Sequence, residues 1–422
     1  MLNGNGAGGA EGTKGGLRIL LVTQYFWPED FRINDLARGL HERGHRVTVL
    51  TGIPNYPDGR FFDGYGARGP REQDYHGVRV LRVPLVSRGQ ARGARLAMNY
   101  ASFALSASVL GALRARGGFD AILVYAPSPI TVGIPAIILG RLTGAPVLFW
   151  LQDLWPEILQ ALGVIRSQRA ARAIERLARF IYRGSDRILV QSRAFAPSVE
   201  RLGGGERLRY LPNTAEDFYR PMAPEEAEGV PPLPDGFRVM VAGNIGASQA
   251  FGTLIAAAER LREHTDIHFV VVGDGRMRPW VEEQVRERGL QDTVHLLGRY
   301  PVEQMPHFFA HADVLLATLG RDPVFEFTIP GKVQPYLACA KPVIASLDGE
   351  GARVVREAGG IACPAEDAEA LANAVLALRE MDPAERAAMG ARARAYFLEH
   401  FDREMLMDRL EGWMRELAEA RR

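Results

Sequence analysis

The chain has 422 residues, which favours two domains, because a single hydrophobic core stops growing at roughly 250 to 300 residues. Hydrophobic residues make up 47% of it and charged residues 24%, and the formal net charge is +1. Large cores can therefore form, and the basic excess typical of a nucleic-acid-binding protein is missing.

In chain order, residues 1–16 lack the apolar core of a signal peptide and are expected to form a disordered tail. From Leu17 the segments RILLVT, NDLARGLHERG and HRVTVLTG predict strand, helix and strand, with apolar strands suited to a buried parallel sheet. Further strands are predicted at VRVLRVPL, AILVY, PVLFWLQD and RILVQS, with a helix at RLAMNYASFALSASVLGALRARG. The most apolar stretch, 121–142, contains three prolines and predicts strand, loop and helix instead of a membrane span. Residues 17–213 are expected to form one doubly wound domain.

The second half repeats this pattern after a linker. Residues 214–236 are rich in proline and acidic residues and poor in periodicity, which is typical of an interdomain connection. Strands are then predicted at RVMVAG, IHFVVVGDG, VHLLG, ADVLLATL and KPVIASLDG, which gives a second Rossmann-like domain over 237–398. Residues 399–422 are expected to form a C-terminal amphipathic helix. The predicted fold class is α/β, with two doubly wound Rossmann-like domains facing across a cleft.

Ligands of open α/β sheets bind beyond the carboxyl ends of the strands, so the strand-to-helix loops hold the candidate sites. The first such loop of the second domain contains Gly243, Asn244, Ile245 and Gly246, where the backbone can approach a diphosphate. A plain tight turn is the alternative. Asp274, in the next such loop, is either a ligand contact or a turn residue.

Lysine usage points to one further residue. Lysine occurs only at Lys14, Lys332 and Lys341, so 51 basic residues minus 3 leaves 48 arginines. Lys332 follows Pro330 and Gly331 at a predicted helix start, where its ammonium and the helix dipole can both meet a phosphate. A solvated lysine is the alternative. Lys341, at the entry of a strand, is expected to be structural.

Three features of the first domain are candidates. Arg32, near a helix start, can reach an anion across the cleft. Asp153, at a strand end, can orient or deprotonate a hydroxyl, or it is an N-cap. The arginine-rich amphipathic segment from Arg166 suits anionic lipid, or it is a solvated helix face.

Cys339 and Cys363 lack metal-site or disulfide spacing, so reduced thiols and no metal site are expected.

Together these segments resemble the retaining glycosyltransferases of family 4, which have the GT-B fold. The resemblance extends from about Leu17 to the C-terminus and rests on RILLVTQYFWPE, RGHRVTVLTG, GNIG, VVGDG with VHLLGRY, and PGKVQPYLACAKPVIASLDGEG. The WPE, QDLWPE and PGKVQPYLA segments look most like the branch of fucosyl- and N-acetylfucosaminyl-type transferases of bacterial exopolysaccharide and O-antigen synthesis.

The resemblance implies a cytoplasmic enzyme with a UDP- or GDP-linked sugar donor in the second domain and a glycan acceptor in the first. It also implies retention of configuration, no metal, no further cofactor, a lipid-diphosphate-linked acceptor and peripheral contact with the inner face of the membrane. The two glutamates common in the family correspond to Phe327 and Pro335 here, with Glu326 adjacent to the first. The family's basic pair corresponds to Asn244 and Gln249.

These arguments assign roles to individual residues. Asp153, Lys332 and Glu326 are the predicted catalytic residues. Donor binding is predicted for a larger set: Arg32, Gly243, Asn244, Ile245, Gly246, Asp274, Arg299, Tyr300, Lys332, Val333, Gln334 and Glu350. Two alternatives remain open: a nucleotide-sugar epimerase or hydrolase on the same fold, and an inactive nucleotide-binding partner in polysaccharide assembly.

Overall fold

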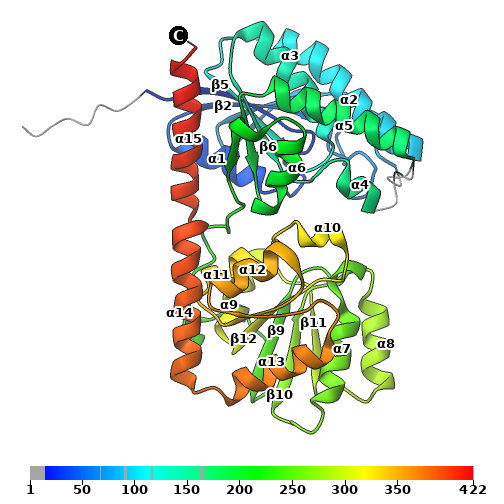
Figure 1. The fold of residues 1–422 in the computed structure, drawn as a ribbon, viewed down its shortest axis with the longest axis vertical. Helices are drawn as coiled ribbons and strands as arrows, with labels where there is room; N and C mark the ends of the chain where they lie inside the picture. Colours follow the sequence, from blue (N-terminus) through cyan, green and yellow to red (C-terminus); the bar gives the residue numbers. More distant parts are fainter. Residues whose placement is uncertain are drawn as a thin grey trace, which may run out of the picture. The chain divides into compact units, whose positions relative to one another are not determined.

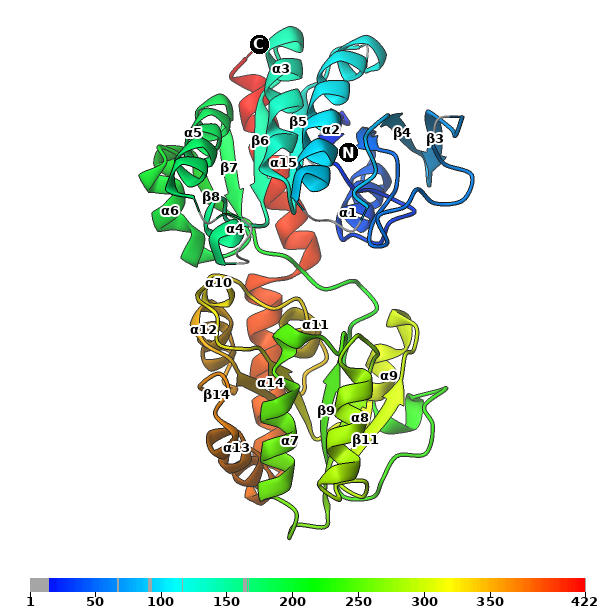
Figure 2. The same cartoon turned by 90° about the vertical axis from the view of Figure 1, so that its right-hand side faces the viewer.

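A computed structural model describes residues 15–66, 68–89, 93–115, 117–161, 165 and 167–421 (Figure 1, Figure 2). Apart from Gly15 and Gly16, the predicted N-terminal tail lies outside the described residues. The described chain contains two separate sheets, of eight and six strands.

The first sheet has the strand order β3-β4-β2-β1-β5-β6-β7-β8. Its strands are β1 (Arg18–Val22), β2 (Arg46–Gly52), β3 (Glu72–Tyr75), β4 (Val78–Val83), β5 (Ala121–Ala126), β6 (Val147–Leu151), β7 (Arg187–Val190) and β8 (Leu208–Tyr210). β1 pairs in parallel with both β2 and β5, and every residue of β5 is buried. Continuous apolar runs therefore form the interior strands, as predicted.

The helices of this half connect successive strands. They are α1 (Ile33–Glu42), α2 (Gly93–Arg114), α3 (Gly133–Thr143), α4 (Glu157–Ala161), α5 (Gln168–Gly184) and α6 (Ala196–Arg201). The apolar stretch 121–142 forms β5, a short 3₁₀ turn and α3, which confirms that prediction. α2 and α3 lie side by side (Figure 1, Figure 2), and a Cβ on Gly111 of α2 would lie 3.5 Å from Leu139 of α3.

The second sheet is parallel in all its described pairings and has the order β11-β10-β9-β12-β13-β14. Its strands are β9 (Phe237–Ala242), β10 (Ile267–Val272), β11 (Val294–Gly298), β12 (Val314–Thr318), β13 (Val343–Ser346) and β14 (Ile361–Cys363). Its helices are α7 (Phe251–Arg260), α8 (Arg278–Glu287), α9 (Met305–Ala310), α10 (Pro323–Glu326), α11 (Val333–Ala338), α12 (Gly349–Glu357), α13 (Ala368–Glu380) and α14 (Pro383–His400).

Two cores cover the two faces of this sheet, because successive side chains of a strand point to opposite faces. Val239 and Val241 of β9 join the core formed with α7, α8 and α13. Met240 and Ala242 of the same strand join the core formed with α9, α11, α12 and α14. Strand order changes direction next to β9, which is where ligands bind in doubly wound folds.

The chain divides into two compact units. The described residues up to 149, with 184–187 and 412–422, form one unit, and residues 150–183 and 188–411 form the other. Within the first unit, Arg187 contacts Glu416 and Arg421 contacts Asp186, both as ion pairs. The last helix, α15 (Arg403–Glu419), thus places its final turns in the unit that contains β1.

Three strands were not predicted from the sequence. β3 is an exposed antiparallel edge strand of sequence EQDY, and β8 and β14 have only three residues each. Residues 214–236 contain no strand and one 3₁₀ turn, Pro224–Glu226. The predicted domain boundaries themselves stay a prediction.

Candidate functional site

Two glycine loops pack against each other at the carboxyl ends of β9 and β10. A Cβ on Gly273 would lie 1.8 Å from the carbonyl oxygen of Gly243, and a Cβ on Gly275 would lie 2.4 Å from that of Ile245. Gly243 and Gly273 both have positive φ angles. Only glycine allows this approach of two backbones, so these glycines let the two loops pack directly against each other.

The amide groups of the Gly243–Gly246 loop divide into two kinds. The amide of Gly243 donates to the carbonyl of Val272 at 2.9 Å, and the amide of Ile245 donates to the carbonyl of Asp274 at 2.9 Å. These two amides hold the loops together and are not available to a diphosphate. Within the described part of the chain, the amides of Asn244 and Gly246 form no hydrogen bond. These two amides are therefore the ones in the loop that can donate to a diphosphate.

Lys332 lies beside this loop. A Cβ on Gly243 would be 4.0 Å from Cε of Lys332, and the Lys332 Nζ donates to Oε1 of Gln249 at 2.7 Å. Burial lowers the pKa of Lys332 to about 8, because the ammonium loses solvation. Among the described residues no carboxylate forms an ion pair with it. A desolvated cation paired only with a neutral amide is arranged to receive an anion.

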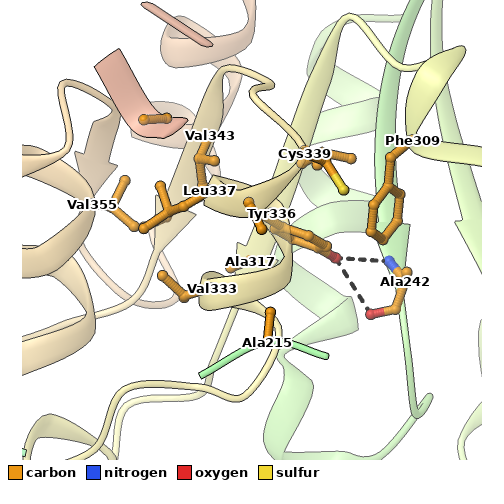
Figure 3. Close-up of a cluster of buried hydrophobic side chains, with 14 of the residues drawn as sticks. Ala215, Ala242, Phe309, Ala317, Val333, Tyr336, Leu337, Cys339, Val343 and Val355 are labelled. Carbon is orange, nitrogen blue, oxygen red and sulfur yellow. Dashed lines mark hydrogen bonds between the residues drawn. The ribbon is translucent and has the colours of Figure 1, made fainter. Parts of the chain in front are cut away.

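The position of Lys332 is fixed by the core behind it. It precedes α11, whose Tyr336 is buried, and Figure 3 shows the Tyr336 hydroxyl bonded to the backbone of Ala242. That hydroxyl accepts from the Ala242 amide at 2.9 Å and donates to the Ala242 carbonyl at 3.4 Å. Because Ala242 immediately precedes Gly243, this contact fixes the position of α11 relative to the glycine loop.

Gln249 is a partner of Lys332 that could not be identified from the sequence. Its side chain accepts from Lys332, and its carbonyl accepts from the Thr318 hydroxyl at 2.6 Å. The next residue, Ala250, has a left-handed backbone at φ 47°. In the sequence, Gln249 stands only as a position where the family has a basic residue. Its contact with Lys332 joins residues 83 positions apart, so no local pattern predicts it.

Two predicted donor-binding residues point into the protein. Val333 is fully buried in the core of α9, α11 and α12. Gln334 is also fully buried, and neither amide atom of its side chain has a hydrogen-bond partner in the described part of the chain. An unpaired buried amide costs roughly 1 to 3 kcal/mol. The side chain of Val333 packs in this core, and donor binding by Val333 and Gln334 stays a prediction.

Residues of the neighbouring loops occupy the predicted strand ends. Asp274 is exposed, and its carboxylate accepts a hydrogen bond from the amide of the next residue, Gly275, at 2.7 Å. Arg299 is exposed directly after β11, and the Tyr300 ring packs edge-on against Phe308 at 4.6 Å. A base pocket at Arg299 and Tyr300 stays a prediction.

The two glutamates differ in how they are held. Glu326 is exposed at the end of α10, whose backbone contacts the start of α12: a Cβ on Gly349 would lie 2.2 Å from the Glu326 carbonyl. Glu350 is 6% exposed and accepts two hydrogen bonds from Arg353, at 2.7 and 2.9 Å. The Glu350 carboxylate is thus engaged by an arginine, whereas that of Glu326 faces solvent.

In the first sheet, Asp153 is partly buried two residues after β6, and Arg32 is partly buried at the N-cap position of α1. Both stand at strand or helix ends as predicted, and their roles stay predictions. Lys341 donates to the carbonyls of Ala310 and Ala312 at 2.7 and 3.0 Å, in keeping with its predicted structural role.

The loops after β1 and β2 share a buried carboxylate that the sequence argument did not identify. Glu29 is 2% exposed and accepts from the backbone amides of Phe26, Asn55 and Tyr56 at 3.2, 2.7 and 2.8 Å. Burial raises its pKa to about 7, although these amides and the nearby Arg82 favour the charged form. Glu29 therefore joins two strand-end loops through one side chain.

Both halves of the chain match families of known proteins. Residues 31–214 match the family described as glycosyl transferase 4-like domain, and residues 236–381 match the family described as glycosyl transferases group 1. The two matches end and begin on either side of the predicted linker.

Individual proteins show the same similarity. The chain is 26% identical over 315 residues to WcaI of Escherichia coli K12, which is assigned to colanic acid biosynthesis as a glycosyl transferase, covering 72% of this chain and 76% of that one. It is 26% identical over 337 residues to a GDP-mannose-dependent alpha-mannosyltransferase of Mycobacterium tuberculosis, covering 78% and 79%. The crystal structure of Anabaena HepE with UDP and glucose superposes with a TM-score of 0.66 at 16% identity, covering 94% and 99%. These similarities confirm the predicted fold of two Rossmann-like domains, the GT-B fold.

Proposed function

We propose that this protein transfers a sugar from a UDP- or GDP-linked donor to a glycan acceptor with retention of configuration. The matches of residues 31–214 and 236–381 to glycosyltransferase families support this proposal. The proposal places the donor diphosphate between Lys332 and the Asn244 and Gly246 amides. The single observation that carries it is the Lys332 ammonium, desolvated beside the glycine loop, whose one side-chain partner among the described residues is Gln249.

The proposed chemistry follows from where charge develops. As the glycosidic bond breaks, negative charge appears on the β-phosphate, and a cation already fixed at that place stabilises the transition state without reorganising. Lys332 supplies this charge, so the proposal needs no metal ion. In a retaining transfer on one face of the sugar, the leaving phosphate accepts the acceptor proton, and Asp153 orients the acceptor hydroxyl. Glu326 hydrogen-bonds hydroxyl groups of the donor.

The finer assignments rest on the sequence motifs. The WPE, QDLWPE and PGKVQPYLA segments support a fucose- or N-acetylfucosamine-type sugar and a lipid-diphosphate-linked acceptor, used in surface polysaccharide synthesis at the inner face of the cytoplasmic membrane. The similarity to WcaI, a glycosyl transferase assigned to colanic acid biosynthesis, supports the same class of product.

The first test is a thermal-shift panel of UDP, GDP, ADP and NAD on the full chain, because a ligand that binds only the folded state raises the unfolding midpoint. We expect a shift with UDP or GDP that is lost in Lys332→Met. Arg286→Met, which removes an exposed positive charge on α8, is the matched control and should keep the shift. A shift of equal size in Lys332→Met would contradict the site.

Turnover then separates the alternatives. With the nucleotide identified, its sugar conjugates are incubated with and without lipid-linked glycan, and nucleotide release is measured. Release that requires acceptor supports the transferase. Release without acceptor indicates a hydrolase, and nucleotide binding without any turnover indicates an inactive partner, in which Phe327 and Pro335 in place of the family glutamates have removed catalysis.

A further inference from the structure

The outer face of α2 forms an apolar groove with the loop that follows β4. The groove has a volume of about 520 Å³ and is lined by Pro84, Leu85, Val86, Ser102, Leu105, Ser106, Val109 and Leu110. Leu105 is 69% exposed and Val109 is 53% exposed. Side chains at positions 102, 105, 106 and 109 share one helix face, so Leu105 and Val109 present apolar surface there, with Ser102 and Ser106 beside them.

The groove is held open by polar contacts beneath it. The Ser106 hydroxyl donates to the Pro84 carbonyl at 2.5 Å, and the Val86 amide donates to the Ser102 hydroxyl at 2.9 Å. The buried Asn99 side chain donates to the Val86 carbonyl at 2.6 Å. These hydrogen bonds fix the loop after β4 to α2, so the position of the apolar side chains on both is set. Exposed apolar surface maintained by such contacts is typical of a binding site.

The same loop continues into a cationic and aromatic cluster two residues later. The Arg88 guanidinium lies over the rings of Tyr25 and Tyr56, at 5.7 and 5.0 Å from their centroids, and donates to the Tyr25 hydroxyl at 3.0 Å. Phe31 stacks on Tyr25 at 5.2 Å and contacts Tyr56 at 5.2 Å. Tyr56 is 37% exposed. The cluster offers a fixed cation next to aromatic surface, which suits a phosphate joined to a sugar.

A second arginine lies between the two features. Arg95, in the first turn of α2, donates to the carbonyl and the hydroxyl of Ser87 at 3.0 and 2.8 Å. The 22 residues of α2 contain Arg95 and Arg114 and no acidic residue. α2 is also the one helix in the described part of the chain that is long and apolar enough to cross a membrane, with 28% of its most apolar window buried. The surface therefore favours a ligand that is anionic at one end and hydrocarbon at the other.

We propose that this surface binds the acceptor substrate: its hydrocarbon chain lies in the α2 groove and its phosphate contacts Arg88, with the attached sugar against Tyr56 and Phe31. This inference rests on the proposed function and names the residues that select an amphiphilic acceptor. The kind of ligand follows from the loop itself, in which Val86 lines the apolar groove and Arg88, two residues later, carries the positive charge. A bilayer surface would need no such order.

The test measures binding of decyl phosphate, below its micelle concentration, to the full chain by titration calorimetry. Decyl maltoside, which lacks the charge, and inorganic phosphate, which lacks the chain, are the comparison probes. We expect Leu105→Gln to weaken decyl phosphate and decyl maltoside about tenfold, and Arg88→Gln to weaken only decyl phosphate about tenfold. Leu142→Gln is the matched control, because Leu142 on α3 is 67% exposed and does not line the groove. It should change neither affinity by more than about twofold.

Three results would overturn the inference. Equal losses in Leu105→Gln and Leu142→Gln would mean a general apolar face. Equal losses of both decyl probes in Arg88→Gln would remove the phosphate contact. Binding to anionic phosphatidylglycerol vesicles but not to decyl phosphate would assign the face to a bilayer. The UDP and GDP thermal shift is measured on every variant and should be unchanged. Its absence in the unmodified protein would count against the proposed function, whereas the decyl phosphate result would stand independently.

Discussion

Replacing Lys332 by methionine should change stability and nucleotide binding in opposite directions. Burial lowers the pKa of Lys332 from 10.5 to about 8, so at pH 7 the folded protein holds a cation that the unfolded chain solvates better. A difference of about 2.5 pKa values corresponds to about 3 kcal/mol. Methionine keeps the aliphatic packing and removes the charge, at the cost of one hydrogen bond to Gln249 worth about 1 kcal/mol. We expect the free energy of unfolding to rise by about 2 kcal/mol.

The pH dependence of this gain follows from the sign of the shift. The folded-state pKa lies below the unfolded value, so the destabilisation is complete below about pH 8 and disappears as pH rises from 8 to 10.5. Chemical denaturation of both proteins at pH 7 and pH 10 measures it. Under the same conditions, nucleotide affinity and turnover should fall by about a hundredfold or more, since a fixed charge at the leaving group is lost. A variant that is less stable at pH 7, or that turns over normally, would refute the reasoning.

Three further outcomes are expected. At pH 8.5, nucleotide binding should take up protons, because the bound diphosphate restores the ammonium of Lys332, and calorimetry in buffers of different ionisation enthalpy should detect uptake that Lys332→Met lacks. Gly273→Ala should abolish nucleotide binding or folding, since its Cβ would meet the Gly243 carbonyl, whereas Gly289→Ala, at a left-handed φ of 62° with open space around it, should cost only about 1 kcal/mol by denaturation. Glu29 should make stability decline as pH rises from about 4.5 to 7, because its raised folded pKa favours the neutral acid, and Glu29→Gln should flatten that decline in a series of thermal melts.

Much of the fold could be predicted because continuous apolar strands and periodic helices are local signals. β5 and β10 are buried along their whole length, and such runs identify interior strands directly. β3 has no apolar run, since an edge strand of alternating exposure needs none. Three-residue strands such as β8 are shorter than the run of roughly four to eight residues by which a strand is recognised.

Site residues could be predicted where the residue type is rare in the sequence. They could not be predicted where their role depends on packing. Lys332 stood out because lysine is almost absent, and the structure places it against the Gly243 loop. The consumption of the Gly243 and Ile245 amides by the neighbouring loop could not be predicted, because it depends on how β9 and β10 align. The Arg88 cluster could not be predicted for the same reason: its rings come from the loops after β1 and β2, and its arginine comes from the loop after β4.

The return of residues 412–422 to the unit that contains β1 sets the order in which the protein can be completed on the ribosome. Arg187 and Asp186 are translated early, but their partners Glu416 and Arg421 follow only after the whole second sheet. At 5 to 20 residues per second, roughly 10 to 45 seconds separate the two. During that interval the Arg187 guanidinium and the Asp186 carboxylate lack these two partners. A chain that ends at the linker would lack them permanently, so residues 412–422 should be supplied to the first half when the two halves are expressed separately.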